Sequence, residues 1–280
     1  VGLLIGLKGS GAFGFRSVRR GMSGRERRRR GYGKGGPWTF RGDAHYQFHL
    51  VPSKVARQYV PADMPLVECF GHTLGGFYYA NYTDSPAGPM DELVVLSGLV
   101  WNAPTSCAWA SHVFVDREDA VAHGIKVFGL PSHKANFVKE DQGVVLKKKG
   151  GGGGGDIVQL SRAGSKNAGG GGGPKINFQL PSFSGRTKTK PSLLRYELQL
   201  QATIQPCKKF VVNFAESKHS LGKQLKSILS GKALVSFTFR NMRMVVNQPE
   251  MVEKKKVEKG HKRNFNLTGN ALRRKQQQLT

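Results

Sequence analysis

Glu92, His133 and Lys134 are the side chains whose types and positions could do chemistry. Glu92 begins a predicted strand at residues 92–101, where its carboxyl group either enters the protein interior or is hydrogen-bonded in a turn with Asp91. His133 could act as an acid or base near neutral pH, or be an ordinary loop histidine. Ser132 and His133 are adjacent, so extended backbone directs their side chains apart, which argues against a Ser–His nucleophile pair.

The remaining candidate groups suggest no metal site. His45 and His49 lie four residues apart, on one face of a predicted strand, but no carboxylate or thiolate completes a ligand set. The three cysteines have no paired spacing, which argues against a disulfide framework and a zinc site and favours a reducing compartment. We therefore expect no metal and no other cofactor.

Short strands must position these side chains. Period-two alternation and β-branched or aromatic residues predict strands at 44–51, 66–70, 73–82, 92–101, 107–115, 175–180, 194–204 and 233–246. Two short helices are expected, at 53–60 and at 117–123, the second capped by Asp116. Many antiparallel strands with little helix predict a mainly β sandwich or barrel, which commonly encloses an apolar pocket. Trp101 and Trp109 then either pack in the core or line that pocket.

The positive charge of the chain, +26 over 280 residues, is unevenly distributed. Residues 1–31 carry +8, residues 32–140 carry −2 and residues 141–280 carry +20. We therefore expect a basic disordered leader or transit segment at 1–31, one domain at 32–252, and a basic disordered tail at 253–280. Two glycine runs predict a flexible insert at 139–173, and neither run has the pattern of a phosphate-binding loop.

The basic segments suggest no specific nucleic-acid partner. A domain that grips phosphates places Lys and Arg on its own surface, whereas the segment richest in aromatic and β-branched residues is slightly acidic. Unspecific contact of the basic segments with nucleic acid or anionic lipid is the alternative to solvated disorder. No apolar run reaches the ~20 residues of a membrane-spanning helix, so we expect no transmembrane segment.

Several runs of residues resemble the neoxanthin-deficient protein family of plants and algae, in the same order along residues 32–252. They are PWTFRG at 37–42, GHTLGGF at 71–77, ANY at 80–82, DSPAG at 84–88, DELVV at 91–95, PTSCAWA at 104–110, GLPS at 129–132, LPSFSG at 180–185 and LLRY at 193–196. That family is similar in fold to acetoacetate decarboxylase. The resemblance implies an antiparallel β-barrel with short helices around a small-molecule cavity.

The same resemblance implies that the decarboxylase chemistry is missing. In the decarboxylase, a lysine forms a Schiff base with the substrate, and an adjacent lysine lowers its pKa. The matching positions after Pro131 are Ser132 and His133, and Lys134 is displaced by one or two residues. A one-residue slip in a strand turns a side chain to the opposite face. The decarboxylase's glutamate matches Glu92, while its arginine aligns with Gly42 or Asp43, next to Arg41.

We expect an accessory protein of neoxanthin biosynthesis, the xanthophyll upstream of abscisic acid, acting in the plastid or cytoplasm. It would bind a lipophilic or carotenoid-like molecule in a barrel cavity and could contact carotenoid-pathway enzymes. The expected pocket is lined by Glu92, Trp101, Trp109, Ser132 and His133. The alternative is an enzyme of the decarboxylase-like superfamily that uses Glu92 and His133 as acid and base, without a Schiff-base lysine, on a small organic acid or carotenoid-derived substrate. A covalent adduct of a keto acid at Lys134, trapped with borohydride, would show that the Schiff-base chemistry is retained. No oligomeric state is indicated.

Overall fold

One large mixed sheet forms the core of the fold in the computed structural model, which describes residues 31–102, 105–148, 155–162, 172–214 and 220–252. Its first half contains β1 (Trp38–Pro52), β2 (Glu68–Cys69), β3 (His72–Asp84), β4 (Met90–Asn102), β5 (Thr105–Val115), β6 (Ser132–Glu140) and β7 (Gly143–Lys148). Its second half contains β8 (Asp156–Arg162), β9 (Lys175–Gly185), β10 (Leu193–Pro206), β11 (Phe210–Phe214), β12 (Ala233–Val246) and β13 (Glu250–Met251). The helices are α1 (Ser53–Ala56), α2 (Glu118–Lys126) and α3 (Ser220–Leu229).

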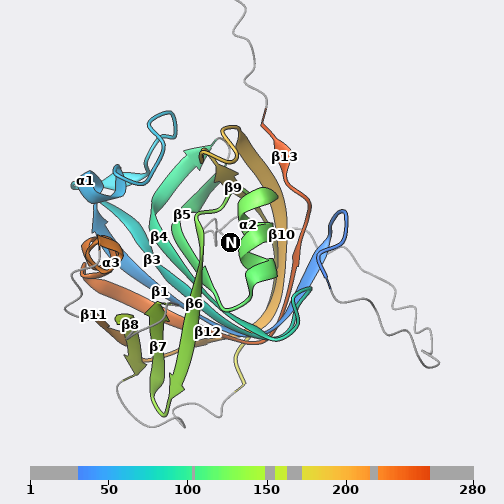
Figure 1. Cartoon of the computed structure of the whole chain (residues 1–280). Coiled ribbons are helices and arrows are strands. Elements are labelled where there is room, and N and C mark those ends of the chain that lie inside the picture. The colour runs from blue at the N-terminus through green and yellow to red at the C-terminus, as the bar shows by residue number, and fades with distance from the viewer. Residues whose placement is uncertain (1–30, 103–104, 149–154, 163–171, 215–219, 253–280) are drawn as a thin grey trace, which may run out of the picture.

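The strands follow the order β11-β8-β7-β6-β5-β4-β3-β1-β12-β10-β13, with β2 beside β3 and β9 beside β10. Every ladder between described strands is antiparallel except the one between β5 and β6, which α2 connects. The mainly β prediction with short helices is confirmed. The prediction of a closed barrel is wrong: the sheet curves strongly, but no ladder between described strands joins its two ends (Figure 1).

The loop after α2 takes the place of a closing ladder near β9. Ser184 Oγ, on β9, donates a hydrogen bond of 2.6 Å to the carbonyl oxygen of Phe128. Gly129 has a positive φ of 59°, and a Cβ built there would lie 3.0 Å from the Cα of Gly185. Side-chain and loop contacts therefore connect this part of the curved sheet to β9, where a closed barrel would have paired strands.

Two buried clusters lie on opposite faces of the sheet. The inner cluster, inside the curve with α2, contains Tyr46, Tyr78, Val94 and Leu198. The outer cluster contains Phe77, Leu93 and Phe114 and packs against α3 and strands β7, β8 and β11. Figure 1 shows α2 within the concave side of the sheet and α3 outside it. Alternation along each strand thus supplies one hydrophobic layer to each face.

The segment 139–173, predicted as a flexible insert, contains two strands. β7 and β8 pair with each other, and β8 also pairs with β11. Val144, Val145, Leu146, Val158 and Leu160 are buried in these strands, so the hairpin removes enough apolar surface from water to favour an ordered backbone. Residues 149–154 and 163–171, which hold most of the glycines, lie outside the described residues, as do 1–30 and 253–280.

The helices differ in detail from the predicted ones. Helix α1 is shorter than the predicted 53–60, ending at Ala56. Asp116 does not cap α2: the N-cap is Arg117, and the Asp116 carboxylate accepts a hydrogen bond from the backbone N–H of Asp91 at 3.2 Å. Helix α3 was not predicted. None of the described helices is long and apolar enough to cross a membrane.

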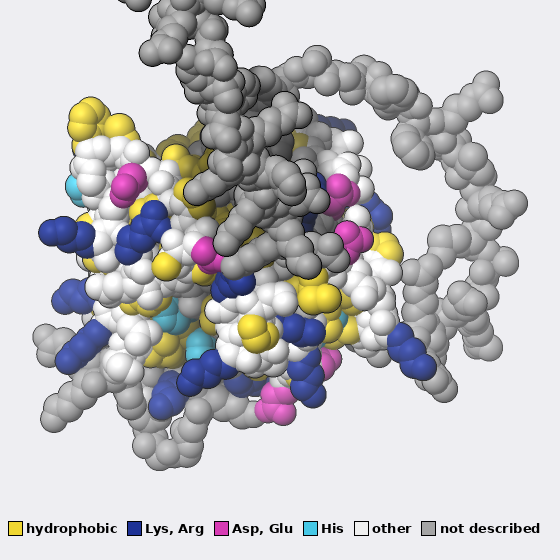
Figure 2. All heavy atoms as spheres, turned by 90° about the horizontal axis from the view of Figure 1, so that it is seen from above, with side chains coloured by type: hydrophobic (Ala, Val, Ile, Leu, Met, Phe, Trp, Pro, Cys, Tyr) yellow, Lys and Arg dark blue, Asp and Glu magenta, His cyan; other side chains and the backbone are white. Residues whose placement is uncertain are grey.

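Charged side chains are scattered over the described surface. On the face shown in Figure 2, Lys and Arg side chains are spread over the described part of the chain, with a few Asp and Glu side chains among them. The expectation that no specific nucleic acid binds stays a prediction.

Candidate functional site

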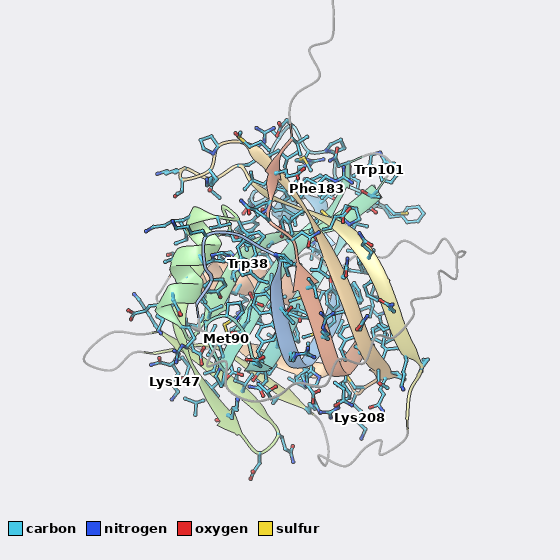
Figure 3. The ribbon with its side chains drawn as sticks, turned by 90° about the vertical axis from the view of Figure 1, so that its right-hand side faces the viewer. Trp38, Met90, Trp101, Lys147, Phe183 and Lys208 are labelled. Carbon is cyan, nitrogen blue, oxygen red and sulfur yellow. The ribbon has the colours of Figure 1, made fainter. Side chains whose placement is uncertain are left out.

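A small cavity of about 50 Å³ lies inside the curve of the sheet, against α2. It is lined mainly by apolar side chains, with Glu92, Ser132, Tyr32, Tyr196 and His123 as its polar groups. Trp38 and Met90 lie in this interior region, close to α2 (Figure 3). Its apolar walls are formed by Phe40, Met90, Val113, Val115, Ala120, Gly124, Phe128, Leu130 and Val246.

Glu92 reaches the cavity because of its place in the alternation of β4. Met90 and Glu92 face inward, whereas Asp91 and Leu93 face the outer side. Glu92 is only 6% exposed, and its Oε2 accepts a hydrogen bond of 2.8 Å from the hydroxyl of Tyr82. Tyr78 continues the chain, with its hydroxyl 3.4 Å from that of Tyr82. The carboxyl group of Glu92 is therefore one end of a buried series of hydrogen-bonded side chains that continues through the hydroxyls of Tyr82 and Tyr78.

Burial controls the protonation of Glu92. Removal from water disfavours the charged form and raises the pKa of Glu92, while the hydrogen bond from Tyr82 acts in the opposite direction and lowers it. Burial and the charge of Glu92 also raise the pKa of Tyr32, so these two groups lie near each other in the cavity. Burial thus shifts Glu92 toward the carboxylic acid form, which can both donate and accept a hydrogen bond.

Helix α2 places a histidine in the same cavity. The ring of His123 stacks on Tyr32, with centroids 3.7 Å apart, and meets Trp38 edge-on at 4.5 Å. Burial lowers the pKa of His123 to about 4, so the imidazole is neutral at pH 7. Its Nε2 is buried and has no hydrogen-bond partner among the described residues. Such an orphaned polar atom beside a cavity calls for a ligand or water.

Ser132 completes the cavity at the start of β6. It pairs in parallel register with Val113 and lies under Gly124 of α2. A Cβ at position 124 would meet Ser132 Oγ at under 3.0 Å, so glycine permits the close approach of helix and strand. Ser132 therefore lines the cavity that contains Glu92.

His133 and Lys134 do not join Glu92. His133 is exposed and packs toward Phe114, with ring centroids 5.5 Å apart, on the outer face of the sheet. Lys134 donates a hydrogen bond to the main-chain carbonyl of Asp116 and lines a separate depression beside α2. The strand alternation that brings Ser132 inward thus turns its neighbour His133 outward. The predicted pairing of Glu92 with His133 is wrong.

The two predicted tryptophans are also outside the Glu92 cavity. Trp101 is 44% exposed and lies at the periphery of the molecule (Figure 3). Trp109 is buried in the outer cluster and lines a second cavity of about 140 Å³ with Phe183 and Arg186. Of the five residues expected in the pocket, Glu92 and Ser132 lie there.

Sequence reasoning missed Tyr32, His123 and Tyr196. His123 and Ala120 are three residues apart in α2, so helical spacing could have placed His123 on the inward face with Ala120. The stacking of Tyr32 on His123 joins segments about ninety residues apart, and no local pattern encodes it.

The two histidines considered as metal ligands, His45 and His49, contact other side chains. His45 contacts Arg162 and Thr238, and His49 lies 2.9 Å from the amide of Gln47. No group of three or more potential metal ligands occurs among the described residues.

The fold is shared with solved structures. An acetoacetate decarboxylase from Legionella pneumophila matches with a TM-score of 0.56 and 16% identity, over 78% of this chain and 88% of that chain. The enduracididine biosynthesis enzyme MppR, solved with bound HEPES buffer, matches with a TM-score of 0.53 and 12% identity, over 79% and 89%. At these identities the likeness establishes the fold only.

Curated relatives are more similar to this chain in sequence than these solved structures are. Protein NEOXANTHIN-DEFICIENT 1 from Solanum lycopersicum is 41% identical over 64% of this chain and 72% of its own length. The protein of the same name from Arabidopsis thaliana is 35% identical over 79% of this chain and 95% of its own length. No family model matches the chain. From the extent of these two alignments, the chain belongs to the NEOXANTHIN-DEFICIENT 1 family and has the acetoacetate decarboxylase-like fold.

Proposed function

We propose that this chain supports neoxanthin biosynthesis by holding, without a covalent bond, the hydroxyl-bearing end of a lipophilic molecule in the Glu92 cavity. The names of its relatives connect the family to neoxanthin. The observation that carries the proposal is the chemistry of the cavity lining: burial shifts Glu92, Tyr32 and His123 toward their uncharged forms, and none of the described residues that line the cavity is a lysine.

The polar groups of the cavity suit a neutral ligand. Burial raises the pKa of Glu92 and the pKa of Tyr32 and lowers the pKa of His123 to about 4. In their uncharged forms, which burial favours, the carboxyl, phenol, serine hydroxyl and imidazole groups offer hydrogen-bond donors and acceptors but no compensating charge. A hydroxyl group can satisfy them, whereas a carboxylate would enter a buried site without a cation.

The position of Lys134 argues against covalent chemistry. A Schiff base requires an amine inside the cavity, and Lys134 instead lines the depression beside α2 and donates to the carbonyl of Asp116. A Schiff base at Lys134 would therefore lie outside the space that Glu92, His123 and Ser132 share.

The size of the cavity limits what enters it. Its volume of about 50 Å³ is well below the ~300–1,000 Å³ of pockets that enclose a drug-sized ligand. A whole carotenoid does not fit, so the ligand's polar end group would lie beside Glu92 and the rest of the molecule outside.

A fluorescence titration of the full chain with 3-hydroxy-β-ionone tests the proposal, because this compound is a short, hydroxylated carotenoid end group. We expect saturable quenching of tryptophan emission, since Trp38 packs beside the cavity through His123. Glu92→Leu removes the carboxyl group and should weaken binding about tenfold or more.

Glu250→Leu is the matched control, because Glu250 is exposed on β13. It should bind like the wild type. Absence of saturable binding by the wild type, or equal affinity in Glu92→Leu, would contradict the proposal.

One observation favours a second function, which is acid–base catalysis without a Schiff base. The unpartnered Nε2 of His123 and the carboxyl of Glu92 line one cavity. The neutral imidazole could therefore take a proton from one atom of a substrate, while the carboxylic acid donates a proton to another atom. In this function His123 replaces His133 as the base.

Incubation with acetone in D₂O, followed by NMR, tests this second function, because a base that takes a proton beside the carbonyl group exchanges that proton for deuterium. Exchange that is lost in both His123→Gln and Glu92→Gln, with no adduct after borohydride treatment, would support it. No exchange above the uncatalysed rate would contradict it for this substrate class.

A further inference from the structure

A wider groove lies on the opposite side of the sheet from the Glu92 cavity. It has a volume of about 380 Å³ and is bounded by β1, β3, the turn between β6 and β7, and the ends of β8 and β11. Tyr79 and Asn81 line it, whereas the alternate residue Tyr82 contacts Glu92 on the inner face. The two sites are thus separated by the thickness of the sheet.

Arg162, the last residue of β8, is the central cation of this groove. Its Nη2 lies 2.6 Å from Nε2 and 3.0 Å from Nδ1 of His45, and its guanidinium stands over the ring of Phe210 at 5.0 Å. Burial, followed by the charge of Arg162, lowers the pKa of His45 to about 3. The histidine is therefore neutral and supplies no negative charge.

Asp43, Glu140 and Asp141 also line the groove, and its two other cations, Arg240 and Lys139, pair with carboxylates. Arg240 pairs with Asp43 at 2.7 Å, and Lys139 pairs with Asp91 at 3.1 Å. The side chain of Glu140 accepts a hydrogen bond of 2.9 Å from Gln159.

Arg162 differs from these groups. Among the residues that the structure describes, its guanidinium contacts the two aromatic rings and no carboxylate. It is also partly buried, and burial lowers its pKa, so the charge is incompletely solvated and has no counter-ion within the described part of the chain. A partly desolvated guanidinium facing an open groove is the usual receptor for an oxyanion, which it binds with two parallel hydrogen bonds.

We propose that this groove binds a small molecule through a carboxylate or phosphate group held by Arg162, with Phe210 and Tyr79 beside it. The volume of the groove falls within the range of ~300–1,000 Å³ for small-molecule sites. Phe210 and His45 fix the guanidinium in place, so less side-chain entropy is lost on binding. The bound group is anionic, in contrast to the neutral ligand of the Glu92 cavity.

Isothermal titration of the full chain with sodium benzoate and with sodium phosphate tests this site. Sodium chloride at equal ionic strength serves as the reference, because the chain carries a charge of +26 and attracts all anions. We expect saturable binding of at least one of the two oxyanions above chloride. Binding of benzoate alone indicates a carboxylate ligand, and binding of phosphate alone indicates a phosphorylated one.

Arg162→Gln removes the charge and should weaken binding about tenfold or more, whereas Arg162→Lys keeps the charge without the planar fork and should retain part of the affinity. Arg195→Gln is the matched control, because Arg195 is exposed on β10, and it should change binding less than about twofold. Equal affinity in Arg162→Gln and wild type would overturn the proposal, as would the absence of saturable binding.

Labelling of the wild type with phenylglyoxal gives a second measurement that does not depend on a folded variant. Peptide mass spectrometry should show that the bound oxyanion protects Arg162 and leaves the labelling of Arg195 unchanged. No protection of Arg162 at saturating anion would also overturn the proposal. Failure of the hydroxyl-ligand titration at Glu92 leaves these outcomes unaffected, because the two sites lie on opposite faces of the sheet.

Discussion

Alanine at Gly124 should destabilise the chain only while Ser132 keeps its hydroxyl. A Cβ at position 124 would lie under 3.0 Å from Ser132 Oγ, and 3.4 Å from Ser132 Cβ. Overpacking of this kind costs about 1–3 kcal/mol, whereas replacing a helical glycine by alanine gains about 1 kcal/mol. Gly124→Ala should therefore lower the free energy of unfolding by up to about 2 kcal/mol.

The sign should reverse when the hydroxyl is removed. In a Ser132→Ala background the nearest atom to the new methyl group is a Cβ at van der Waals distance, so Gly124→Ala should stabilise the chain by about 0.5–1 kcal/mol. The two substitutions would then be coupled by about 2 kcal/mol, within the range seen for residues in contact. Urea unfolding of the four proteins in the double-mutant cycle measures this coupling.

Ala122→Gly supplies the control for helix propensity, because Ala122 is exposed on the same helix. It should cost about 0.5–1 kcal/mol. If Gly124→Ala stabilises the chain as much with Ser132 present as in the Ser132→Ala background, the close contact between α2 and β6 that places Ser132 in the cavity is wrong.

Three further perturbations have defined outcomes. Glu92→Gln should change the pH dependence of stability: burial raises the pKa of Glu92, so in the wild type its contribution is present below the ordinary pKa of about 4.3 and is lost as the pH rises through the higher folded-state value. Urea unfolding between pH 4 and 9 should show the free energy of the wild type falling relative to that of the variant. Gln47→Leu should cost about 3 kcal/mol or more in urea unfolding, because the Gln47 amide bonds to both backbone groups of Phe210, at 2.6 and 3.0 Å, and to Ser236 at 2.6 Å. Leu225→Ala should cost about 2–5 kcal/mol in thermal or urea unfolding, because this α3 side chain is fully buried in the outer cluster.

Each of these has a contrary result. A wild type whose unfolding free energy rises with pH relative to Glu92→Gln would mean that the carboxyl is ionised in the folded chain. For Gln47, the exposed Gln199→Leu on β10 is the control and should cost less than about 0.5 kcal/mol. Equal costs at the two glutamines would refute the buried network. A cost below about 1 kcal/mol for Leu225→Ala would mean that α3 is not docked on the sheet.

The fold class could be predicted from the sequence because strand alternation is a local signal. The same signal, with the resemblance to a known family, gave Glu92 an inward position. It also contained the correct orientation of His133: once Ser132 faces inward, its neighbour must face outward. The expected pair of Glu92 and His133 ignored this constraint.

Other features depend on contacts between distant segments. Whether the curved sheet closes is decided by how the loop at 127–131 packs against β9, through the hydrogen bond from Ser184 to Phe128. The strands in 139–173 gain order by pairing with each other and with β11, about fifty residues away. Helix α3 did carry a local signal, because Leu221, Leu225, Ile228 and Leu229 follow helical spacing.

The central claim is that Glu92 recognises the hydroxyl group of a neutral end group inside the sheet. Its most direct test compares the dissociation constants of 3-hydroxy-β-ionone and β-ionone, which lacks the hydroxyl, for wild type and for Glu92→Leu. If the carboxyl and the hydroxyl contact each other, removing either should weaken binding about tenfold, and removing both should weaken it little further. If the ratio of the two dissociation constants is the same in both proteins, Glu92 does not contact the hydroxyl and the claim is wrong.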